Sequence, residues 1–218
     1  MKALIVADGD VPSRAAVDAL LGSTPPDIVV AADGGALKAV ALGWRPTVVV
    51  GDADSLSATD VERMRADGAE VIVHPTDKDE SDTELALREA LSRGATDVVV
   101  IGAFGGTRLE HTIANLLLLT LPELDGRDVR LADGASEVRV VRDGQVLMLE
   151  GAVGDFVSLF PLAPIVDGVT TGGLEFALTN ESLHQGPARG LSNVMSADRA
   201  TVTARTGPLL VVHTRLER

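Results

Sequence analysis

The strongest constraint on the fold is a change in the spacing of apolar residues near residue 132. Before that point, short apolar runs rich in β-branched residues alternate with segments of helical periodicity. Runs without polar alternation are typical of strands that are covered on both faces, as in a parallel sheet. The predicted strands of this first part are Ala3–Val6, Ile28–Ala31, Val48–Val50, Val71–Val73, Val98–Ile101 and Val129–Leu131.

Residues typical of helix ends lie between these runs. Ser57 with Asp60, and Ser81 with Glu84, match the S-x-x-[DE] capping box, in which two side chains satisfy backbone N–H groups at a helix start. A further apolar stripe of helical spacing stops at Pro122. We therefore predict an α/β domain over residues 1–132, with a mostly parallel sheet in a three-layer, Rossmann-like arrangement.

After residue 132 the helical period disappears. Short alternating runs are separated by turn dipeptides such as Asp143-Gly144 and Asp167-Gly168. This pattern predicts an all-β sandwich over residues 133–218. Its predicted strands are Glu137–Arg142, Gln145–Leu149, Phe156–Leu162, Leu174–Leu178, Thr201–Thr206 and Leu209–Thr214.

The charge of the chain disfavours polyanionic partners. It carries 32 acidic and 19 basic residues, a formal net charge of -13. Such a charge repels phosphate backbones and anionic lipid surfaces. We therefore expect no nucleic-acid partner, and an anionic ligand would need local cations or a metal ion.

Cysteine and long apolar segments are both lacking. Without cysteine there can be no disulfide, thiolate nucleophile or Cys-ligated zinc. The apolar run around Ile113–Leu121 is well short of the ~20 residues needed to span a bilayer. The apolar stretch after Met1-Lys2 is also too short for a signal peptide. These features predict a soluble cytoplasmic protein with no membrane partner.

Polar turns follow directly after the predicted strands of the first domain. The clearest are Asp33-Gly34-Gly35, Gly51–Ser55 and Gly102–Gly106. The carboxyl ends of parallel strands line one crevice, so these turns are expected to face a common site. Two carboxylates ~4 Å apart repel by about 4 kcal/mol at an effective dielectric near 20, and a cation relieves that repulsion.

The acidic residues of these turns predict a magnesium site. Asp52 and Asp54 end one strand, and Asp82 follows Ser81. Carboxylate oxygens without neighbouring cysteine or paired histidine suit Mg²⁺, which usually also binds substrate phosphates. The alternatives are a solvated turn at Asp52 and Asp54, and a helix-capping role for the segment around Asp82.

Other residues of the turns are suited to phosphate. Asp33-Gly34-Gly35 opens a predicted helix, and Arg108 offers a guanidinium group for bidentate contact. His111 and Asn115 are four residues apart and share a helix face. A core position is the alternative for His111. Neither a P-loop nor a complete G-x-G-x-x-G is present, which disfavours the ordinary P-loop and dinucleotide enzymes.

Read in order, these motifs resemble the thiamine pyrophosphokinase family. The matching segments are A-D-G-G-A at 32–36, G-D-x-D-S at 51–55, K-D-x-[ST]-D-x-E at 78–84, G-G-x-R-L-E-H at 105–111 and G-L-S-N at 190–193. The resemblance implies a nucleotide domain followed by a β-sandwich, and transfer of pyrophosphate from ATP to thiamine with Mg²⁺. It also implies a homodimer, with sites between the nucleotide domain of one subunit and the β-domain of the other.

The resemblance assigns roles residue by residue. It implies Asp52, Asp54 and Asp82 as magnesium ligands and catalytic residues together with Arg108, and Ser192, Asn193 and Phe176 as thiamine-binding residues. The residues implied on the nucleotide side are Asp33, Gly34, Gly35, Lys78, Asp79, His111 and Asn115.

Three positions depart from the family pattern. Ala53 replaces a bulky residue, Glu110 stands where Asp is usual, and Thr107 is an additional residue before Arg108. Two other functions stay open at this point: a pyrophosphokinase for another heteroaromatic alcohol such as a pterin, and a non-catalytic nucleotide or thiamine diphosphate sensor.

Overall fold

The computed structural model describes residues 1–52 and 55–216. The chain forms two compact units, Met1–Gly134 and Ala135–Arg218, and each is described by itself. The division falls close to the boundary predicted after residue 132.

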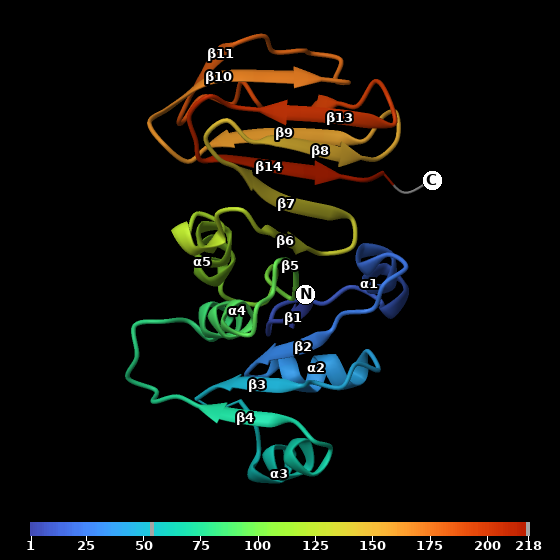
Figure 1. Cartoon of the computed structure of the whole chain (residues 1–218), viewed down its shortest axis with the longest axis vertical. Helices are drawn as coiled ribbons and strands as arrows, with labels where there is room; N and C mark the ends of the chain where they lie inside the picture. Colours follow the sequence, from blue (N-terminus) through green and yellow to red (C-terminus); the bar gives the residue numbers. More distant parts are fainter. Residues whose placement is uncertain (53–54, 217–218) are drawn as a thin grey trace. The chain divides into compact units, whose positions relative to one another are not determined.

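The first unit is built on a parallel sheet (Figure 1). Its strands follow the spatial order β6-β5-β1-β2-β3-β4, and all neighbouring pairs are parallel. All six predicted strands are confirmed. Their bounds are β1 Lys2–Val6, β2 Ile28–Ala32, β3 Val48–Gly51, β4 Glu70–Val73, β5 Asp97–Ile101 and β6 Asp128–Ala132.

Local capping signals define two of the helices. Ser57 accepts a hydrogen bond from the Asp60 N–H and Asp60 accepts one from the Ser57 N–H, so the predicted capping box is present. Ser81 caps the next helix at the Glu84 N–H, but the Glu84 carboxylate bonds to Arg88 instead of completing a box. The helices are α1 Arg14–Leu21, α2 Gly35–Ala41, α3 Ala58–Ala66, α4 Asp82–Ser92, α5 Leu109–Leu118 and the 3-10 turn η1 Pro122–Leu124.

Helices cover both faces of this sheet. Leu4 and Val6 pack with Val17 of α1 and Ala39 of α2 on one face. The alternate residue Ile5 is also fully buried, and α4 contacts β1, β2 and β3. In Figure 1, α4 and α5 lie on one side of β1 and β5, and α1 lies on the other. The three-layer α/β prediction is confirmed.

The second unit is a sandwich of two antiparallel sheets. One has the order β12-β9-β14-β7 and the other β11-β10-β13-β8. Its core combines Val157 and Val211 of the first sheet with Val166 and Val202 of the second, which confirms the predicted sandwich. The bounds are β7 Ser136–Val141, β8 Val146–Glu150, β9 Phe156–Pro161, β10 Ile165–Gly172, β11 Glu181–His184, β12 Asn193–Val194, β13 Arg199–Thr203 and β14 Leu209–Thr214.

One predicted strand of this unit is wrong. In the range Leu174–Leu178, Leu174 forms only an isolated bridge to Met195, and the rest is turn and irregular backbone. Gly173 adopts a positive φ of 71°, and a Cβ there would lie 2.2 Å from the Arg199 carbonyl oxygen. This close approach changes the direction of the chain after β10. The alternating apolar residues of Leu174–Leu178 therefore do not pair as a strand.

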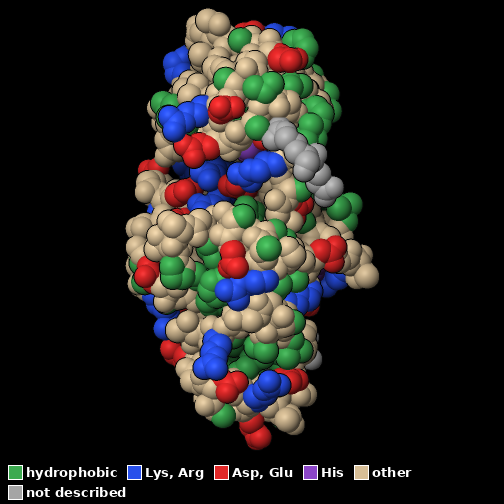
Figure 2. All heavy atoms as spheres, turned by 90° about the vertical axis from the view of Figure 1, so that its right-hand side faces the viewer, with side chains coloured by type: hydrophobic (Ala, Val, Ile, Leu, Met, Phe, Trp, Pro, Cys, Tyr) green, Lys and Arg blue, Asp and Glu red, His purple; other side chains and the backbone are tan. Residues whose placement is uncertain are grey.

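The surface mixes charges of both signs. On the face drawn in Figure 2, acidic and basic side chains are interspersed with apolar ones. On this face the excess of acidic residues therefore does not form one large acidic patch. Among the described residues, no helix is both long enough and apolar enough to cross a membrane.

Candidate active site

The ends of β1, β2 and β5 surround a pocket of about 290 Å³ in the first unit. The structure therefore brings several of the polar turns together, as the strand-end argument predicts. The start of α4 and the first turns of α5 complete the pocket wall. The lining residues are Ala7, Asp8, Gly9, Ala32, Asp33, Ser81, Asp82, Thr83, Gly102, Ala103, Gly105, Gly106, Thr107, Arg108, His111 and Asn115.

Glycines allow the turns around this pocket to approach one another closely. A Cβ on Gly9 would lie 2.3 Å from the Phe104 carbonyl oxygen, and one on Gly35 would lie 2.1 Å from that of Val6. No side chain fits at such distances. Asp33, just before the two glycines that begin α2, has a positive φ of 44°, a conformation that Asp tolerates better than most residues.

Three carboxylates meet beside the pocket. Asp33, Asp52 and Asp82 each offer an oxygen, and these oxygens all lie within 4.8 Å of one another. The resemblance implies Asp52 and Asp82 as magnesium ligands, but it implies Asp33 as part of the nucleotide-side turn. The pairing of β2 with β3, with Ala32 opposite Val50, explains how Asp33 comes next to Asp52. Asp54 lies outside the described residues.

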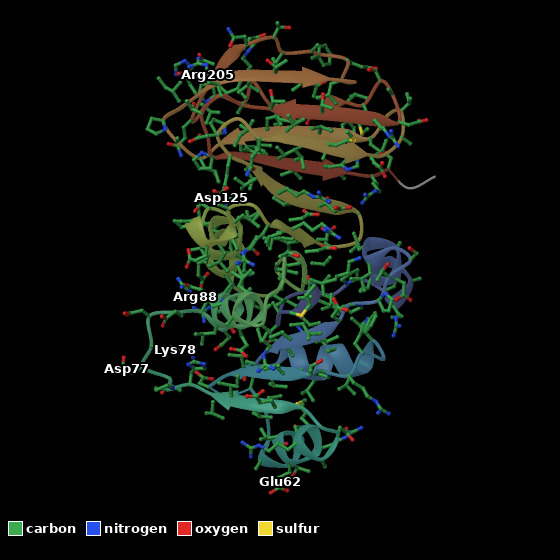
Figure 3. The ribbon with its side chains drawn as sticks, in the orientation of Figure 1. Glu62, Asp77, Lys78, Arg88, Asp125 and Arg205 are labelled. Atoms are coloured by element: carbon green, nitrogen blue, oxygen red, sulfur yellow. The ribbon has the colours of Figure 1, made fainter. Side chains whose placement is uncertain are left out.

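Lys78 lies against two of these carboxylates. Its Nζ is 3.4 Å from Asp52 Oδ2 and 3.1 Å from Asp82 Oδ1. In Figure 3, Lys78 turns toward the strand ends, whereas its neighbour Asp77 points away. Burial lowers the pKa of Lys78, but hydrogen bonds and attraction to Asp82 and Asp52 outweigh this and raise it above its ordinary value. Lys78 is therefore positively charged at neutral pH.

The donor set fits a hard divalent cation. Asp33, Asp52 and Asp82 present carboxylate oxygens, which are the ligands that Mg²⁺ prefers. Their closeness is unfavourable for three negative charges, although Lys78 contacts Asp52 and Asp82. The chemistry of this donor set therefore suits Mg²⁺.

The first turns of α5 bring polar side chains to the wall of the pocket. Arg108 and His111 are exposed and line the pocket, so a core position for His111 is wrong. Arg108 Nε is 2.7 Å from Glu110 Oε1, and this hydrogen bond lowers the pKa of Glu110. Asn115 is buried and its Nδ2 donates to the Ala103 carbonyl oxygen at 2.8 Å. Asn115 thus holds the turn after β5 as well as facing the pocket.

Asp79 and Thr107 differ in their position relative to the pocket. Asp79 is exposed and is not among the residues that line the pocket. Thr107, the additional residue before Arg108, does line it, so the departure from the family pattern falls in the wall of the pocket.

In the second unit, Asn193 and Phe176 lie side by side. Asn193 Oδ1 accepts from the Phe176 N–H at 3.0 Å, and Asn193 Nδ2 donates to the Phe176 carbonyl oxygen at 2.7 Å. Phe176 is 68% exposed and lies outside the strands, so it is not a core residue. Ser192 is exposed, has a positive φ of 58° and donates its N–H to Ser158 Oγ at 3.0 Å.

Both units match known protein families. Residues 24–131 match the family model described as the catalytic domain of thiamin pyrophosphokinase. Residues 144–209 match the model of the vitamin B1 binding domain of thiamin pyrophosphokinase.

Curated proteins and solved structures agree with these matches. A thiamine pyrophosphokinase of Bacillus subtilis is 24% identical over 183 residues, covering 84% of this chain and 85% of that protein. Thiamine pyrophosphokinase 1 of Oryza sativa subsp. japonica is 25% identical over 174 residues, covering 76% of this chain and 65% of that protein. The crystal structure of a thiamin pyrophosphokinase family protein from Enterococcus faecalis is 26% identical, with a TM-score of 0.82 over 100% of both chains.

Proposed function

The chain belongs to the thiamine pyrophosphokinase family, and we propose that the pocket at the ends of β1, β2 and β5 is the site at which it acts on ATP. The activity is transfer of pyrophosphate from ATP to thiamine, which yields thiamine diphosphate and AMP. The observation that carries the placement is the meeting of Asp33, Asp52 and Asp82 beside a pocket that also presents Arg108 and His111.

The reaction needs little covalent chemistry from the protein. The hydroxyl oxygen of thiamine attacks the β-phosphorus of ATP, and the bond from that phosphorus to the bridging oxygen of AMP breaks. Such transfers are accelerated mainly by alignment of the two reactants and by stabilisation of charge on the phosphate oxygens. The side chains that can do this are the cationic groups facing the pocket and the carboxylates beside it.

Arg108 and Lys78 supply positive charge from two sides. Arg108 lines the pocket and reaches it from the start of α5, and its guanidinium group suits two phosphate oxygens. Lys78 is held at the carboxylates by Asp52 and Asp82, so its ammonium group is already placed next to the cation-binding oxygens. His111 and Asn115, on one face of α5, orient the phosphates at the same wall.

Mg²⁺ would be held by Asp52, Asp54 and Asp82, as the resemblance implies, and by Asp33 as a further ligand. When bound, it offsets phosphate charge and fixes the orientation of the phosphates. The proximity of the carboxylate oxygens of Asp33, Asp52 and Asp82, all within 4.8 Å of one another, supports the proposal of Asp33 as a ligand.

Thiamine recognition is assigned to the loop of the second unit that carries Phe176. An exposed aromatic ring whose backbone is fixed by Asn193 suits stacking on a heteroaromatic ring. Ser192 is the polar partner within the same region. Since Asn193 uses both its amide oxygen and its amide nitrogen on Phe176, we assign it to the support of this ring.

A second copy of the chain is proposed as the partner. Leu109, Ile113 and Leu117 recur every fourth residue on α5 and are 72%, 51% and 51% exposed. An exposed apolar stripe of this kind is suited to association. Light scattering at micromolar concentration tests the homodimer. Ile113→Glu is expected to give the mass of a monomer, and an unchanged mass would place the interface elsewhere. The cytoplasmic location stays a prediction.

One assay tests the activity against the two other functions. The protein is incubated with ATP and Mg²⁺ and with either thiamine or a hydroxymethyl pterin, and AMP and the diphosphate product are measured. We expect AMP only with thiamine. AMP with the pterin alone would support a different acceptor, and binding without AMP would support a sensor.

A further inference from the structure

The ammonium group of Lys38 contacts the turn after β1, which lines the pocket. Lys38 lies on α2, and its Nζ is 2.7 Å from the Gly9 carbonyl oxygen and 3.0 Å from Asp8 Oδ1. It also donates to the carbonyl oxygen of Asp8. A lysine ammonium has three N–H donors, and here three oxygens of consecutive residues receive them. The contacts therefore fix the turn after β1 to the helix after β2.

This turn is a structural part of the pocket. Asp8 and Gly9 both line it. The Gly9 N–H donates to the Gly102 carbonyl oxygen at 2.7 Å, and the Asp10 N–H donates to that of Phe104 at 2.8 Å. The turn held by Lys38 is thus bonded directly to the turn after β5.

The same connection continues into α5. Ala103, between the two residues that receive these backbone bonds, accepts the side-chain hydrogen bond of Asn115. Asn115 lies on the helix that carries His111. A continuous set of contacts therefore runs from Lys38 on α2 through both turns to the wall of α5.

Close packing leaves little room for the turn to move. A Cβ on Gly9 would be 2.3 Å from the Phe104 carbonyl oxygen. On the other side, a Cβ on Gly34 would be 2.8 Å from the carboxylate of Asp8. A shift of the Asp8–Gly9 turn would therefore disturb the start of α2 and the turn after β5 together.

We propose that Lys38 is a positioning residue for the nucleotide, which fixes the Asp8–Gly9 turn and offsets the charge of Asp8 beside bound phosphates. The proposal rests on the proposed function in that it takes the pocket to bind ATP. The hydrogen bonds from Lys38 to the two carbonyl oxygens support the proposal more strongly than its ion pair with Asp8 does. The Asp8 carboxylate is largely exposed, and exposed ion pairs contribute little to stability. Lys38 acts through the turn and is not assigned contact with the reacting atoms.

Lys2 provides a matched control. Its Nζ also donates to a backbone carbonyl, that of Leu21 at 2.8 Å, and lies 3.5 Å from a carboxylate of Asp97. Lys2 begins β1, whereas the pocket lies beyond the end of that strand. Lys38→Met and Lys2→Met therefore remove the same kind of contacts at opposite ends of one strand.

The experiment compares ATP binding by calorimetry, with Mg²⁺ and without thiamine, and the KM values of both substrates. We expect Lys38→Met to weaken ATP binding and raise the KM for ATP by about tenfold, the effect of losing hydrogen bonds to a charged donor. The KM for thiamine is expected to stay unchanged. Lys38→Arg, which keeps the charge and several donors, should restore ATP binding to within about threefold.

Three results would overturn the proposal: unchanged ATP binding in Lys38→Met, an equal loss in Lys2→Met, or a parallel rise in both KM values. Thermal denaturation of both methionine variants separates a general loss of stability from a local effect. If the wild-type protein bound ATP but formed no AMP with thiamine, the proposed function would fail, while the binding comparison would still decide the role of Lys38.

Discussion

The two units each contain a group of acidic and basic side chains, but the groups differ in how their charges are arranged. In the first unit, three carboxylate oxygens lie within 4.8 Å of one another, and Lys78 contacts Asp52 and Asp82. In the second unit, the buried Glu137 lies against Arg139 at 3.1 Å and Arg215 at 2.5 Å. Three carboxylates converge in the first group and Lys78 contacts two of them, whereas in the second group Glu137 is paired with two arginines.

Asp155 extends the second group into the sandwich. It is 1% exposed, and its oxygens accept from the backbone N–H groups of Ala152 at 2.9 Å and Leu216 at 3.2 Å. His213 Nε2 is 3.4 Å from Asp155 Oδ2. These donors compensate the cost of burying a charge, so the group has a structural role.

The difference suggests how the two kinds of group can be told apart. Buried carboxylates that are matched by donors stabilise the fold and need no ligand. Carboxylates that converge beside a pocket raise the free energy of the empty site, and a bound cation recovers it.

Replacement of Asp52 by Ala should remove activity and leave the fold intact. Loss of a cation-binding carboxylate is expected to lower the rate of AMP formation by about 10³-fold, because stabilisation of phosphate charge is lost. The rate is measured with saturating ATP, thiamine and Mg²⁺. Asp18→Ala, at an exposed aspartate paired with Arg14, is the control and should keep normal turnover. Near-normal turnover in Asp52→Ala would reject the metal assignment.

Replacement of Asp155 by Ala should have the opposite outcome. The change leaves two backbone N–H groups of the sandwich without their acceptor, and we expect the free energy of unfolding to fall by about 3 kcal/mol. Urea denaturation measures it. The exposed Asp198→Ala in the same unit should change stability by less than about 0.5 kcal/mol. An equal loss in both variants would show that the buried position has no special role.

Replacement of Lys78 by Met tests whether this lysine serves catalysis or only stabilises the fold. We expect the rate of AMP formation to fall by about 10²-fold, because one cation next to the phosphates is lost. The unfolding free energy should fall as well, since Asp52 and Asp82 lose the cation that contacts them. A large loss of stability with normal turnover of the folded protein would place Lys78 with the structural group.

The two groups should also differ in their response to pH. Burial and the charge of Arg215 lower the pKa of His213 below 6.5, although Asp155 and Glu137 oppose this. As the pH falls, His213 is therefore protonated at a higher pH in the unfolded chain than in the folded protein. The stability that depends on neutral His213 is present above about pH 6.5 and is lost as the pH falls below it. Lys78, whose pKa is raised above 10.5, keeps its contribution throughout this range and loses it only at higher pH.

Denaturation between pH 7.5 and pH 5.5 checks the effect of His213. The wild-type protein should lose stability over this interval, and His213→Gln should lose less. Identical pH dependence in the two proteins would assign the acid sensitivity to another group.

Local sequence signals predicted much of the fold. The strands of the first unit follow from unbroken apolar runs, and Ser57 and Ser81 cap their helices through contacts within three residues. Apolar alternation was not sufficient at Leu174–Leu178, because the close approach at Gly173 and the side chain of Asn193 determine the path of that backbone. Those interactions join residues that are distant in the sequence.

The amino-acid sequence alone predicted the division into an α/β unit and a sandwich, the acidic positions at the end of one strand, Asp52, and at the start of one helix, Asp82, and the resemblance to one family. Only the tertiary structure decided that Asp33 joins these two carboxylates and that Lys38 holds the turn after β1. The reason is the spatial order of the strands, with β1 between β2 and β5 and β2 beside β3. That order determines which turns are neighbours, and neither periodicity nor capping signals contain it.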